Sequence, residues 1–320
     1  MSNRLLISFS GGETSAFMTH WILRNWQNQY DEIVVVFANT GEEREETLEF
    51  VRDCDERFGF GTVWVEAITF HGERRSSGAR VVNFETASRN GEPFEQTIMK
   101  YGIPNPKFKG CTRNLKRNPI EAFARSLGWP PNSWDTAIGI RTDEIDRMSE
   151  DARNRRLVYP LVRPCPMNEA QISGWWSRQN FRLRLKGYEG NCRTCWKKSF
   201  RKLMTIAEER PEFFDFNSRM ESAYDLVGPE FRHDPATRLS PLPIGYRRTF
   251  FRENKSTEDI FAMLAERKAA GRFIPAADSK SAMEFDFGTL AFDEEIDGNN
   301  GCEEACEPYG IDDTDEEISA

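Results

Sequence analysis

The segment Ile7–Phe17, "ISFSGGETSAF", has the residue types of a loop that holds phosphate. The apolar stretch "RLLISF" leads into Gly11 and Gly12, and a helical sequence follows over about residues 15–27. Adjacent glycines let the backbone approach a phosphate closely, and the start of a helix offers N–H groups and a dipole that favour an anion. Hydroxyl donors come from Ser8, Ser10, Thr14 and Ser15. The pattern predicts a nucleotide site; because it fits neither the Walker A nor the dinucleotide-binding fingerprint, a plain strand-to-helix turn is the alternative.

Four of the seven cysteines could serve as metal ligands. Cys192 and Cys195 form a C-x-x-C pair in a Lys- and Arg-rich stretch, Cys111 follows a glycine, and Cys165 lies between prolines. A C-x-x-C pair clamps a metal or acts as a redox pair, and a Cys₄ zinc site would use all four residues. An odd number of cysteines without a signal peptide favours thiols or metal ligands over a disulfide framework. The basic neighbours of the pair predict a lowered thiol pKa.

The elements that must position these residues follow from the hydrophobic pattern. Residues 4–8, 32–39 and 62–68 are apolar runs that predict parallel strands covered on both faces, with helices between them. This order predicts an α/β fold with a doubly wound, mainly parallel, Rossmann-like sheet. Right-handed crossovers would place the loops after the first two strands at one carboxyl edge, where ligands bind. A further strand is expected over residues 134–141, and residues 71–110 are expected to form a long loop or a partly ordered insertion.

Composition divides the chain into three parts. Residues 1–158 are expected to form a nucleotide-binding α/β domain, residues 159–282 a helical, Cys- and Arg-rich region that completes the site, and residues 283–320 an acidic disordered tail. No apolar run approaches the length of a membrane span, and the amino terminus reaches a strand without a cleavage site. A cytoplasmic protein without a membrane partner is therefore expected.

The net charge of −9 is unevenly distributed. The tail from Glu284 holds 14 acidic residues and no Lys or Arg, so residues 1–283 carry a net charge of +5. Between Arg141 and Thr205 there are 15 basic and 7 acidic residues. A basic stretch of this kind suits a polyanionic partner such as a nucleic acid, and a solvated surface of mixed charge is the alternative.

The glycine loop resembles that of the PP-loop ATP pyrophosphatases. "SFSGGETS" is similar to their SGGxxS loop, and the sequence further resembles the phosphoadenosine phosphosulfate (PAPS) reductase family, including its DNA-phosphorothioation and phage-encoded relatives. The resemblance implies an adenine-nucleotide α-hydrolase-like fold. The usual family pattern is SGGKDS, whereas this chain has Glu13 and Thr14 in place of the lysine and the aspartate. Glu13 would then point away from the phosphates or help to place Mg²⁺.

Two further stretches carry the same resemblance. "VVFANTGEEREETLEF" is similar to the family's second strand, which ends in a [D/N]TG turn beside the nucleotide, here Asn39, Thr40 and Gly41. "GCTRNLKRNPIEAF" is similar to the family's C-x-x-x-x-K-x-x-P segment, with Cys111 and Lys116 at the first two positions. The segments follow one another in the order that the family shows.

A fourth stretch, "IGIRTDEIDRM", resembles the family's G-[IV]-R-x-[DE]-E segment at the end of a strand. Arg141 would clamp phosphate, because a planar guanidinium binds phosphate in bidentate fashion. Asp143 and Glu144 would hold Mg²⁺ together with the phosphates. The alternative for these two acids is charge compensation at the start of a helix.

The resemblance implies an enzyme that uses ATP with Mg²⁺, cleaves it between the α- and β-phosphates, adenylates an acceptor and transfers sulfur to it. The implied catalytic residues are Ser10, Ser15, Lys116, Arg141, Asp143 and Glu144. The implied nucleotide-binding residues are Ser8, Gly11, Gly12, Thr14, Asn39, Thr40 and Gly41. The partners would be a nucleic-acid acceptor, DNA or tRNA, and a protein that donates sulfur. The alternatives are a sulfonucleotide reductase, although the C-terminal E-C-G-[IL]-H motif of that branch has no match here, and a non-catalytic nucleotide- or nucleic-acid-binding protein.

The resemblance also implies an iron–sulfur cluster at the cysteines. Cys111, Cys192 and Cys195 match the cluster-bearing segments of the family. On a [4Fe–4S] cluster these three would leave one iron open, unless Cys165 is the fourth ligand. A structural zinc on the same four residues is the alternative.

Overall fold

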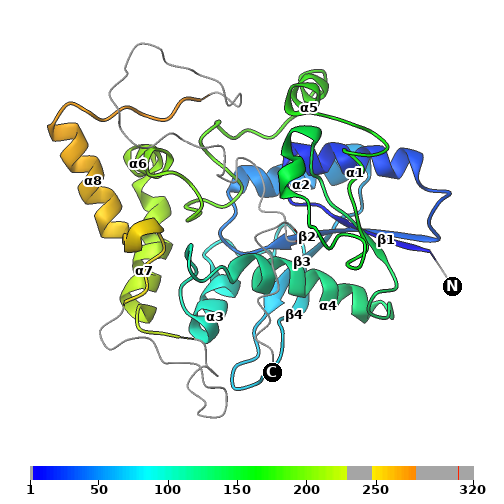
Figure 1. The fold of residues 1–320 in the computed structure, drawn as a ribbon, viewed down its shortest axis with the longest axis horizontal. Coiled ribbons are helices and arrows are strands. Elements are labelled where there is room, and N and C mark those ends of the chain that lie inside the picture. The colour runs from blue at the N-terminus through cyan, green and yellow to red at the C-terminus, as the bar shows by residue number, and fades with distance from the viewer. Residues whose placement is uncertain (1–2, 229–246, 279–308, 310–320) are drawn as a thin grey trace.

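A six-stranded, mainly parallel sheet forms the centre of the α/β part (Figure 1). The structure is a computed structural model, which describes residues 3–228, residues 247–278 and Tyr309. The strand order is β4-β3-β2-β1-β5-β6, and of these strands only β4 runs antiparallel to its neighbour. The bounds of the strands are β1 Arg4–Ser8, β2 Glu32–Asn39, β3 Val63–Ile68, β4 Gly78–Val82, β5 Asp135–Ala137 and β6 Leu157–Val158.

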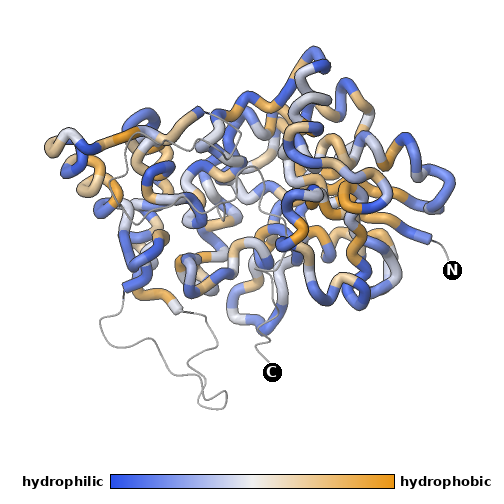
Figure 2. The backbone as a smooth tube through the Cα atoms, turned by 45° about the horizontal axis from the view of Figure 1, so that its top comes forward, coloured by the Kyte–Doolittle hydropathy of each residue, from blue (hydrophilic) through white to orange (hydrophobic). Residues whose placement is uncertain are grey.

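Alternate side chains of the central strands bury both faces of the sheet. On β1, Leu5 and Ile7 belong to one core with side chains of α1 (Glu13–Asn25) and α2 (Glu45–Phe58). Leu6 belongs to another core, with side chains of α4 (Asn118–Ser126). Figure 2 shows the hydrophobic segments gathered in the interior. Successive side chains of a strand point to opposite faces, so the continuous apolar runs become buried on both sides. The predicted doubly wound α/β fold is confirmed.

The order of the strands reverses beside β1. The chain leaves β1 for β2 and β3 on one side, and later returns to pair β5 with the other side of β1. In open parallel sheets this reversal marks the crevice at the carboxyl ends of the strands where ligands bind. The loop that follows β5 comes very close to the first turn of α1 there, since a Cβ added to Gly139 would lie 3.1 Å from the Cα of Ser15.

Residues 71–110 do not form the expected long loop. They contain the edge strand β4 and the helix α3 (Glu92–Tyr101). Residues 78–82 pair along their whole length with β3. Pairing with a buried strand thus outweighs a composition that favours turns. The strand expected over residues 134–141 is also shorter than predicted, since β5 ends at Ala137.

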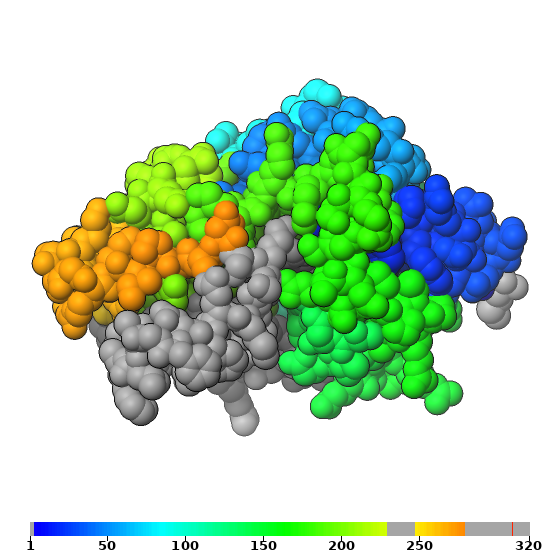
Figure 3. All heavy atoms as spheres, turned by 90° about the horizontal axis from the view of Figure 1, so that it is seen from above, coloured from blue at the N-terminus to red at the C-terminus, as the bar shows by residue number. Residues whose placement is uncertain are grey.

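A group of helices lies beside the sheet, at the left in Figure 1. The helices α6 (Phe200–Glu209), α7 (Asp215–Tyr224) and α8 (Thr257–Ala269) share a separate hydrophobic cluster with α3. Seen from above, the green segments in the middle of the chain lie between the blue amino-terminal part and the orange α8 (Figure 3). The helix α5 (Glu169–Trp176) packs against α1, and Trp176 enters the core of the sheet.

The remaining helices are short. They are the π-helix η1 (Thr112–Arg117) and the 3₁₀-helices η2 (Thr142–Arg147), η3 (Pro211–Phe214) and η5 (Arg252–Asn254). No helix in the described part of the chain is long and apolar enough to cross a membrane. The domain boundary at residue 158 stays a prediction, and the expected disordered tail lies, apart from Tyr309, outside the described residues.

Candidate functional site

The glycine loop joins β1 to α1 in a conformation that requires glycine. Gly11 has φ +83°, and a Cβ at this position would lie 2.8 Å from Cγ2 of Thr47. Gly12 precedes α1 in an extended conformation, and no side chain caps the helix there. The first N–H groups of α1 are therefore without a side-chain cap, as a phosphate site at a helix start requires.

Two of the predicted hydroxyl donors hold this loop in shape. The hydroxyls of Ser10 and Ser15 lie 2.8 Å apart, and Ser15 Oγ donates to the carbonyl of Gly12 at 3.0 Å. The N–H of Ser10 donates to Ser15 Oγ at 3.2 Å. Both serines are buried, as is Ser8 at the end of β1. The serines therefore fix the path of the loop in addition to any contact with a ligand.

Glu13, which stands where the family has lysine, points away from the loop. Its carboxylate accepts two hydrogen bonds from the Arg182 guanidinium, at 2.9 Å and 3.0 Å. Its side chain is only 2% exposed, whereas that of Arg182 is 38% exposed. Trp176 Nε1 donates to the Glu13 carbonyl at 2.9 Å. Glu13 thus ties the start of α1 to the segment after α5.

Arg141 reaches the glycine loop from the end of β5. One of its guanidinium nitrogens donates to Thr14 Oγ1 at 3.2 Å, and its side chain is 9% exposed. Its Nε lies 3.2 Å from Asp143 and 3.7 Å from Glu144. The Glu144 carboxylate also accepts the Arg141 N–H at 3.3 Å, which caps η2. In this geometry the two acids orient Arg141 and cap a short helix.

The Asn39–Gly41 turn is held from inside the protein. The Asn39 amide donates to Glu66 at 2.7 Å and to the carbonyl of Ser88 at 2.9 Å. The Gly41 N–H donates to Asn39 Oδ1 at 3.2 Å. Glu66 was not among the predicted site residues, although an acidic residue within an otherwise apolar strand indicates a buried polar contact. Asn39 therefore shapes the turn, and Glu66 positions Asn39.

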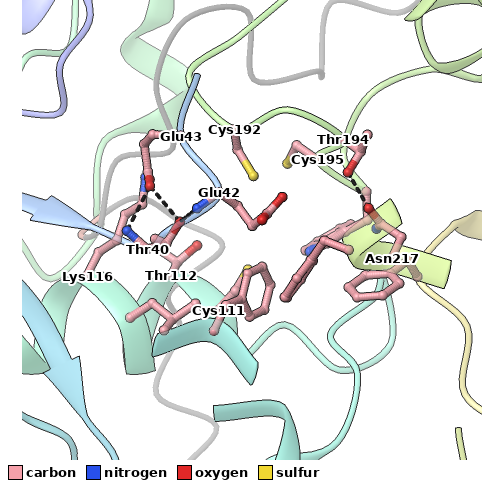
Figure 4. A pocket seen from close by; sticks show the side chains of 15 residues that line it. Thr40, Glu42, Glu43, Cys111, Thr112, Lys116, Cys192, Thr194, Cys195 and Asn217 are labelled. Carbon is pink, nitrogen blue, oxygen red and sulfur yellow. Dashed lines mark hydrogen bonds and ion pairs between the residues drawn. The ribbon is translucent and has the colours of Figure 1, made fainter. Parts of the chain in front are cut away.

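Three of the predicted ligand cysteines line one cavity next to this turn (Figure 4). Cys192 and Cys195 come from the segment before α6, and Cys111 lies at the start of η1. The wall also includes Thr40, Glu42, Glu43 and Lys116. Among the described residues, no three His, Cys, Asp or Glu side chains lie close enough together to hold a single metal ion.

Cys165 is not brought to this cavity. It packs against the core cluster that contains α1 and α5, and it is absent from the residues that line the cavity. Its place between prolines gave no information about its distance from the other cysteines. The described geometry thus brings together three of the four predicted thiol ligands and separates the fourth.

The segment with the C-x-x-C pair is hydrogen-bonded to the glycine loop and to the turn after β2. The Arg44 N–H donates to the carbonyl of Asn191 at 2.8 Å, and the Arg193 N–H donates to that of Glu42 at 3.0 Å. Between them, Glu43 and Cys192 form an antiparallel bridge. The Asn191 amide then donates to the Ser10 carbonyl at 2.8 Å.

Two carboxylates, those of Glu42 and Glu43, lie beside the thiols. The pKa of Cys192 is raised by its contact with the Cys195 thiol, by burial and by the carboxylates of Glu43 and Glu42. The expected lowering by basic neighbours is therefore wrong for this thiol. Burial raises the pKa of Glu42 to about 8, although Arg193 opposes the shift. The cavity lined by Cys111, Cys192 and Cys195 is called the thiol cavity below. Neither glutamate was among the residues predicted for it.

The catalytic candidate Lys116 forms an ion pair with Glu43. Lys116 Nζ lies 3.7 Å from Glu43 Oε1, and both side chains are buried. The other oxygen of Glu43 accepts hydrogen bonds from the N–H and the hydroxyl of Thr40, both at 2.8 Å. Glu43 thus links Lys116 to the turn after β2 and leaves Lys116 at the wall of the thiol cavity.

The pair of Glu13 and Arg182 predicts a measurable coupling. Arg182→Gln leaves a buried carboxylate without its partner and should lower the free energy of unfolding by about 3 kcal/mol. Glu13→Gln should cost less, about 1 kcal/mol, because the guanidinium that remains is partly exposed. Urea unfolding of both variants and of the double variant should give a coupling energy of about 1–2 kcal/mol. Strictly additive effects would contradict this role of Glu13.

The raised pKa of Glu42 predicts a pH dependence of the metal-free protein. The unfolded chain releases the Glu42 proton near pH 4.5, whereas the folded chain keeps it up to about pH 8. The unfolded state then binds fewer protons, so stability should fall as pH rises from 4.5 to 8. In the Glu42→Gln variant, the decrease in the free energy of unfolding between pH 4.5 and 8 should be smaller by up to about 5 kcal/mol. Urea melts of chelator-treated protein at several pH values measure it, and parallel pH profiles for both proteins would contradict the burial of Glu42.

The chain is similar in sequence to a known protein domain and to two uncharacterized proteins. A family model described as the phosphoadenosine phosphosulfate reductase domain matches residues 4–156. The uncharacterized nin region protein ORF290 of Escherichia phage lambda is 27% identical over 301 residues, which cover 89% of this chain and 99% of that protein. The uncharacterized protein MJ0066 of Methanocaldococcus jannaschii is 25% identical over 158 residues, 48% of this chain and 26% of that protein.

Among solved structures, the crystal structure of PAPS reductase from Candida auris, a phosphate complex, is similar with a TM-score of 0.34 and 14% identity. The similarity covers 54% of this chain and 71% of that chain. The matched residues 4–156 contain the glycine loop, the turn after β2 and Arg141. Over residues 4–156 the chain is therefore similar to the phosphoadenosine phosphosulfate reductase domain.

Proposed function

We propose that this chain cleaves ATP between the α- and β-phosphates, adenylates an acceptor and transfers sulfur to it. An oxygen of the acceptor would attack the α-phosphorus, and pyrophosphate would leave. Sulfur at the oxidation level of sulfide, supplied by a sulfur-donor protein, would then attack the adenylated position of the acceptor, and AMP would leave with the oxygen. The nucleotide would lie against the glycine loop, at the point where the order of the strands reverses. The uncapped start of α1 supports a phosphate there, because its N–H groups and dipole favour negative charge.

Arg141 is the residue of this chain best placed to neutralise charge on the phosphates. Its guanidinium contacts Thr14 in the first turn of α1, and Asp143 holds it from the other side. A guanidinium positioned before the reaction stabilises developing charge without reorganisation. Mg²⁺ bound with ATP would supply further charge neutralisation. The roles of Asp143 and Glu144 that this geometry supports are the orientation of Arg141 and the capping of η2.

The observation that carries the proposal is the hydrogen bond from Asn191 to the Ser10 carbonyl, at 2.8 Å. Asn191 directly precedes Cys192, so this hydrogen bond joins a thiol-bearing segment to the glycine loop itself. Thr40 also lines the thiol cavity and follows β2 at the same carboxyl edge. Nucleotide activation and sulfur chemistry would thus take place within one continuous site.

An iron–sulfur cluster suits the thiol cavity better than one zinc ion. A single zinc needs four ligands at about 2.0–2.3 Å in a tetrahedron. Among the described residues, no three His, Cys, Asp or Glu side chains are arranged to hold one metal ion. A cluster presents several irons and accepts thiolates that are farther apart. Cys111, Cys192 and Cys195 would hold it. When bound, it would supply a site for sulfur beside the activated acceptor.

A sulfonucleotide reductase is the second candidate, because the matching family model is that of PAPS reductases. Such an enzyme would bind a sulfonucleotide on the same loop and would need a thiol donor. The two functions differ in their substrates, so one assay separates them. The adenylating enzyme releases pyrophosphate from ATP, and the reductase consumes a sulfonucleotide.

The first experiment is a pyrophosphate-release assay with ATP and Mg²⁺. The wild-type protein should release pyrophosphate, and Arg141→Lys should reduce the rate by about 10- to 100-fold, since a lysine loses the planar fork of donors. Arg24→Lys is the matched control, because Arg24 is an exposed residue in the last turn of α1. Consumption of a sulfonucleotide without pyrophosphate release from ATP would favour the reductase instead.

The acceptor that we propose is a nucleic acid, DNA or tRNA, which the basic stretch from Arg141 to Thr205 supports. Binding should then weaken steeply with salt, by about a thousandfold between 50 and 200 mM if six or more phosphates are contacted. A fluorescence titration with labelled DNA and tRNA at several salt concentrations measures this. Absence of binding to both at 50 mM salt would contradict a nucleic-acid acceptor.

A further inference from the structure

The backbone of Glu42 is fixed directly opposite the C-x-x-C segment. Gly41, with φ +85°, turns the chain after β2, and the carbonyl of Glu42 accepts the N–H of Arg193 at 3.0 Å. On its other side, Glu43 pairs with Cys192 in an antiparallel bridge. Glu42 is therefore held next to the thiol-bearing segment by main-chain contacts on both sides.

The carboxylate of Glu42 is buried, and one of its oxygens lacks a hydrogen-bond donor in the described part of the chain. The side chain is 2% exposed, and the oxygen without a donor is Oε1. The nearest cation is Arg193, whose guanidinium lies 3.7 Å from Oε1, an ion-pair distance without a hydrogen bond. In Figure 4 the carboxylate lies in the cavity between the pair Cys192 and Cys195 and, on the opposite side, Cys111.

The neighbouring Glu43 has one hydrogen-bonded oxygen in the same wall and, among the described residues, one buried oxygen without a hydrogen-bond partner. One of its oxygens accepts two hydrogen bonds from Thr40 at 2.8 Å, and the other faces Lys116 at 3.7 Å. Trp196 also lines the cavity with a buried indole N–H that has no acceptor among the described residues. Within this part of the chain the wall thus holds two unsatisfied acceptors, Glu42 Oε1 and Glu43 Oε1, and one unsatisfied donor, which buried polar groups rarely are. Of the two carboxylates, only that of Glu42 lies between the three cysteines in Figure 4.

A bound iron–sulfur cluster would satisfy Glu42 Oε1 and the Trp196 N–H. Carboxylate oxygen is a common ligand of protein-bound iron, and an N–H group near the sulfurs of a cluster tunes its potential. A buried carboxylate is costly unless a cation or donors compensate it, and iron supplies that compensation. Three cysteines leave one iron of a four-iron cluster without a protein thiolate.

We propose that Glu42 Oε1 is the fourth protein ligand of a [4Fe–4S] cluster whose other ligands are Cys111, Cys192 and Cys195. The inference rests on the cluster in the proposed function and assigns the position that Cys165 does not reach. An oxygen ligand is exchanged more readily than a thiolate. The fourth iron is therefore the one that a sulfur-containing ligand would reach.

The test is anaerobic reconstitution of the full chain with ferrous iron and sulfide, followed by iron and sulfide analysis and electron paramagnetic resonance. Glu42→Gln keeps the shape of the side chain and removes the negatively charged ligand. It should load a cluster that loses about one iron in four on mild oxidation, about 10- to 100-fold faster than the wild type. Its resonance spectrum should change with the loss of that iron.

Two further variants sharpen the result. Glu42→Cys should supply a fourth thiolate and retain iron longer than the wild type under the same oxidation. Glu121→Gln is the matched control, because Glu121 is a carboxylate of α4 that does not line the cavity. It should retain iron like the wild type.

The outcomes separate this inference from the proposed function. In the first outcome, the wild type loads a cluster and Cys192→Ser does not. If Glu42→Gln and Glu42→Cys then both retain iron and give the same paramagnetic resonance spectrum as the wild type, only the role of Glu42 is overturned. If the wild type takes up no iron with sulfide, the cluster in the proposed function fails, and the ligand assignment fails with it. Circular dichroism of each variant identifies any that has not folded, and the other Glu42 variant then decides.

Discussion

The candidate site depends on a short antiparallel contact between two segments that are about 150 residues apart in the sequence. The segment after β2 pairs with the C-x-x-C segment through Arg44, Cys192 and Arg193. Each hydrogen bond contributes only about 1 kcal/mol, but together they fix the register of the two segments. Because Asn191 continues this contact to the carbonyl of Ser10, the thiols, the turn and the phosphate loop occupy fixed positions relative to one another. Without this pairing, the same residues would lie in unrelated loops.

The fold could be predicted from the sequence because its signals are local. Apolar runs such as "EIVVVFAN" predict a strand buried on both faces, and glycines indicate where the chain must turn. The site could be predicted only where a motif carried it. Glu66 holds Asn39, and Glu42 faces the thiols, yet their burial depends on segments that pack on them from elsewhere in the chain. The position of Cys165 could not be predicted from the sequence either, since its distance from the other thiols is a property of the folded chain.

The pair of Glu13 and Arg182 shows how the loop could lose its lysine and keep its shape. A carboxylate in a phosphate-binding loop would repel the ligand if it faced the phosphates. The bidentate contact with Arg182 turns it toward the segment after α5 and neutralises it there. The loop then presents backbone N–H groups and serine hydroxyls, while Arg141 is the cation that meets α1 from the opposite side of the site. Arg141, which matches the arginine of the family's own segment, is thus a positive charge that this chain keeps beside the loop without the lysine.

The electrostatics of the thiol cavity follow from the same principle of compensation. Glu42 and Glu43 each lie 3.7 Å from a cation, Arg193 and Lys116 respectively, so the wall is close to neutral. Only Glu43 also has hydrogen bonds, from Thr40, and these hold it in place. Glu42 lacks them, and burial therefore favours its protonated form in the metal-free protein. A cation in the cavity would reverse that preference, because opposite charge stabilises the carboxylate and the thiolates together. Binding of a cationic group would then release protons from both kinds of side chain, which makes the affinity of the cavity rise with pH.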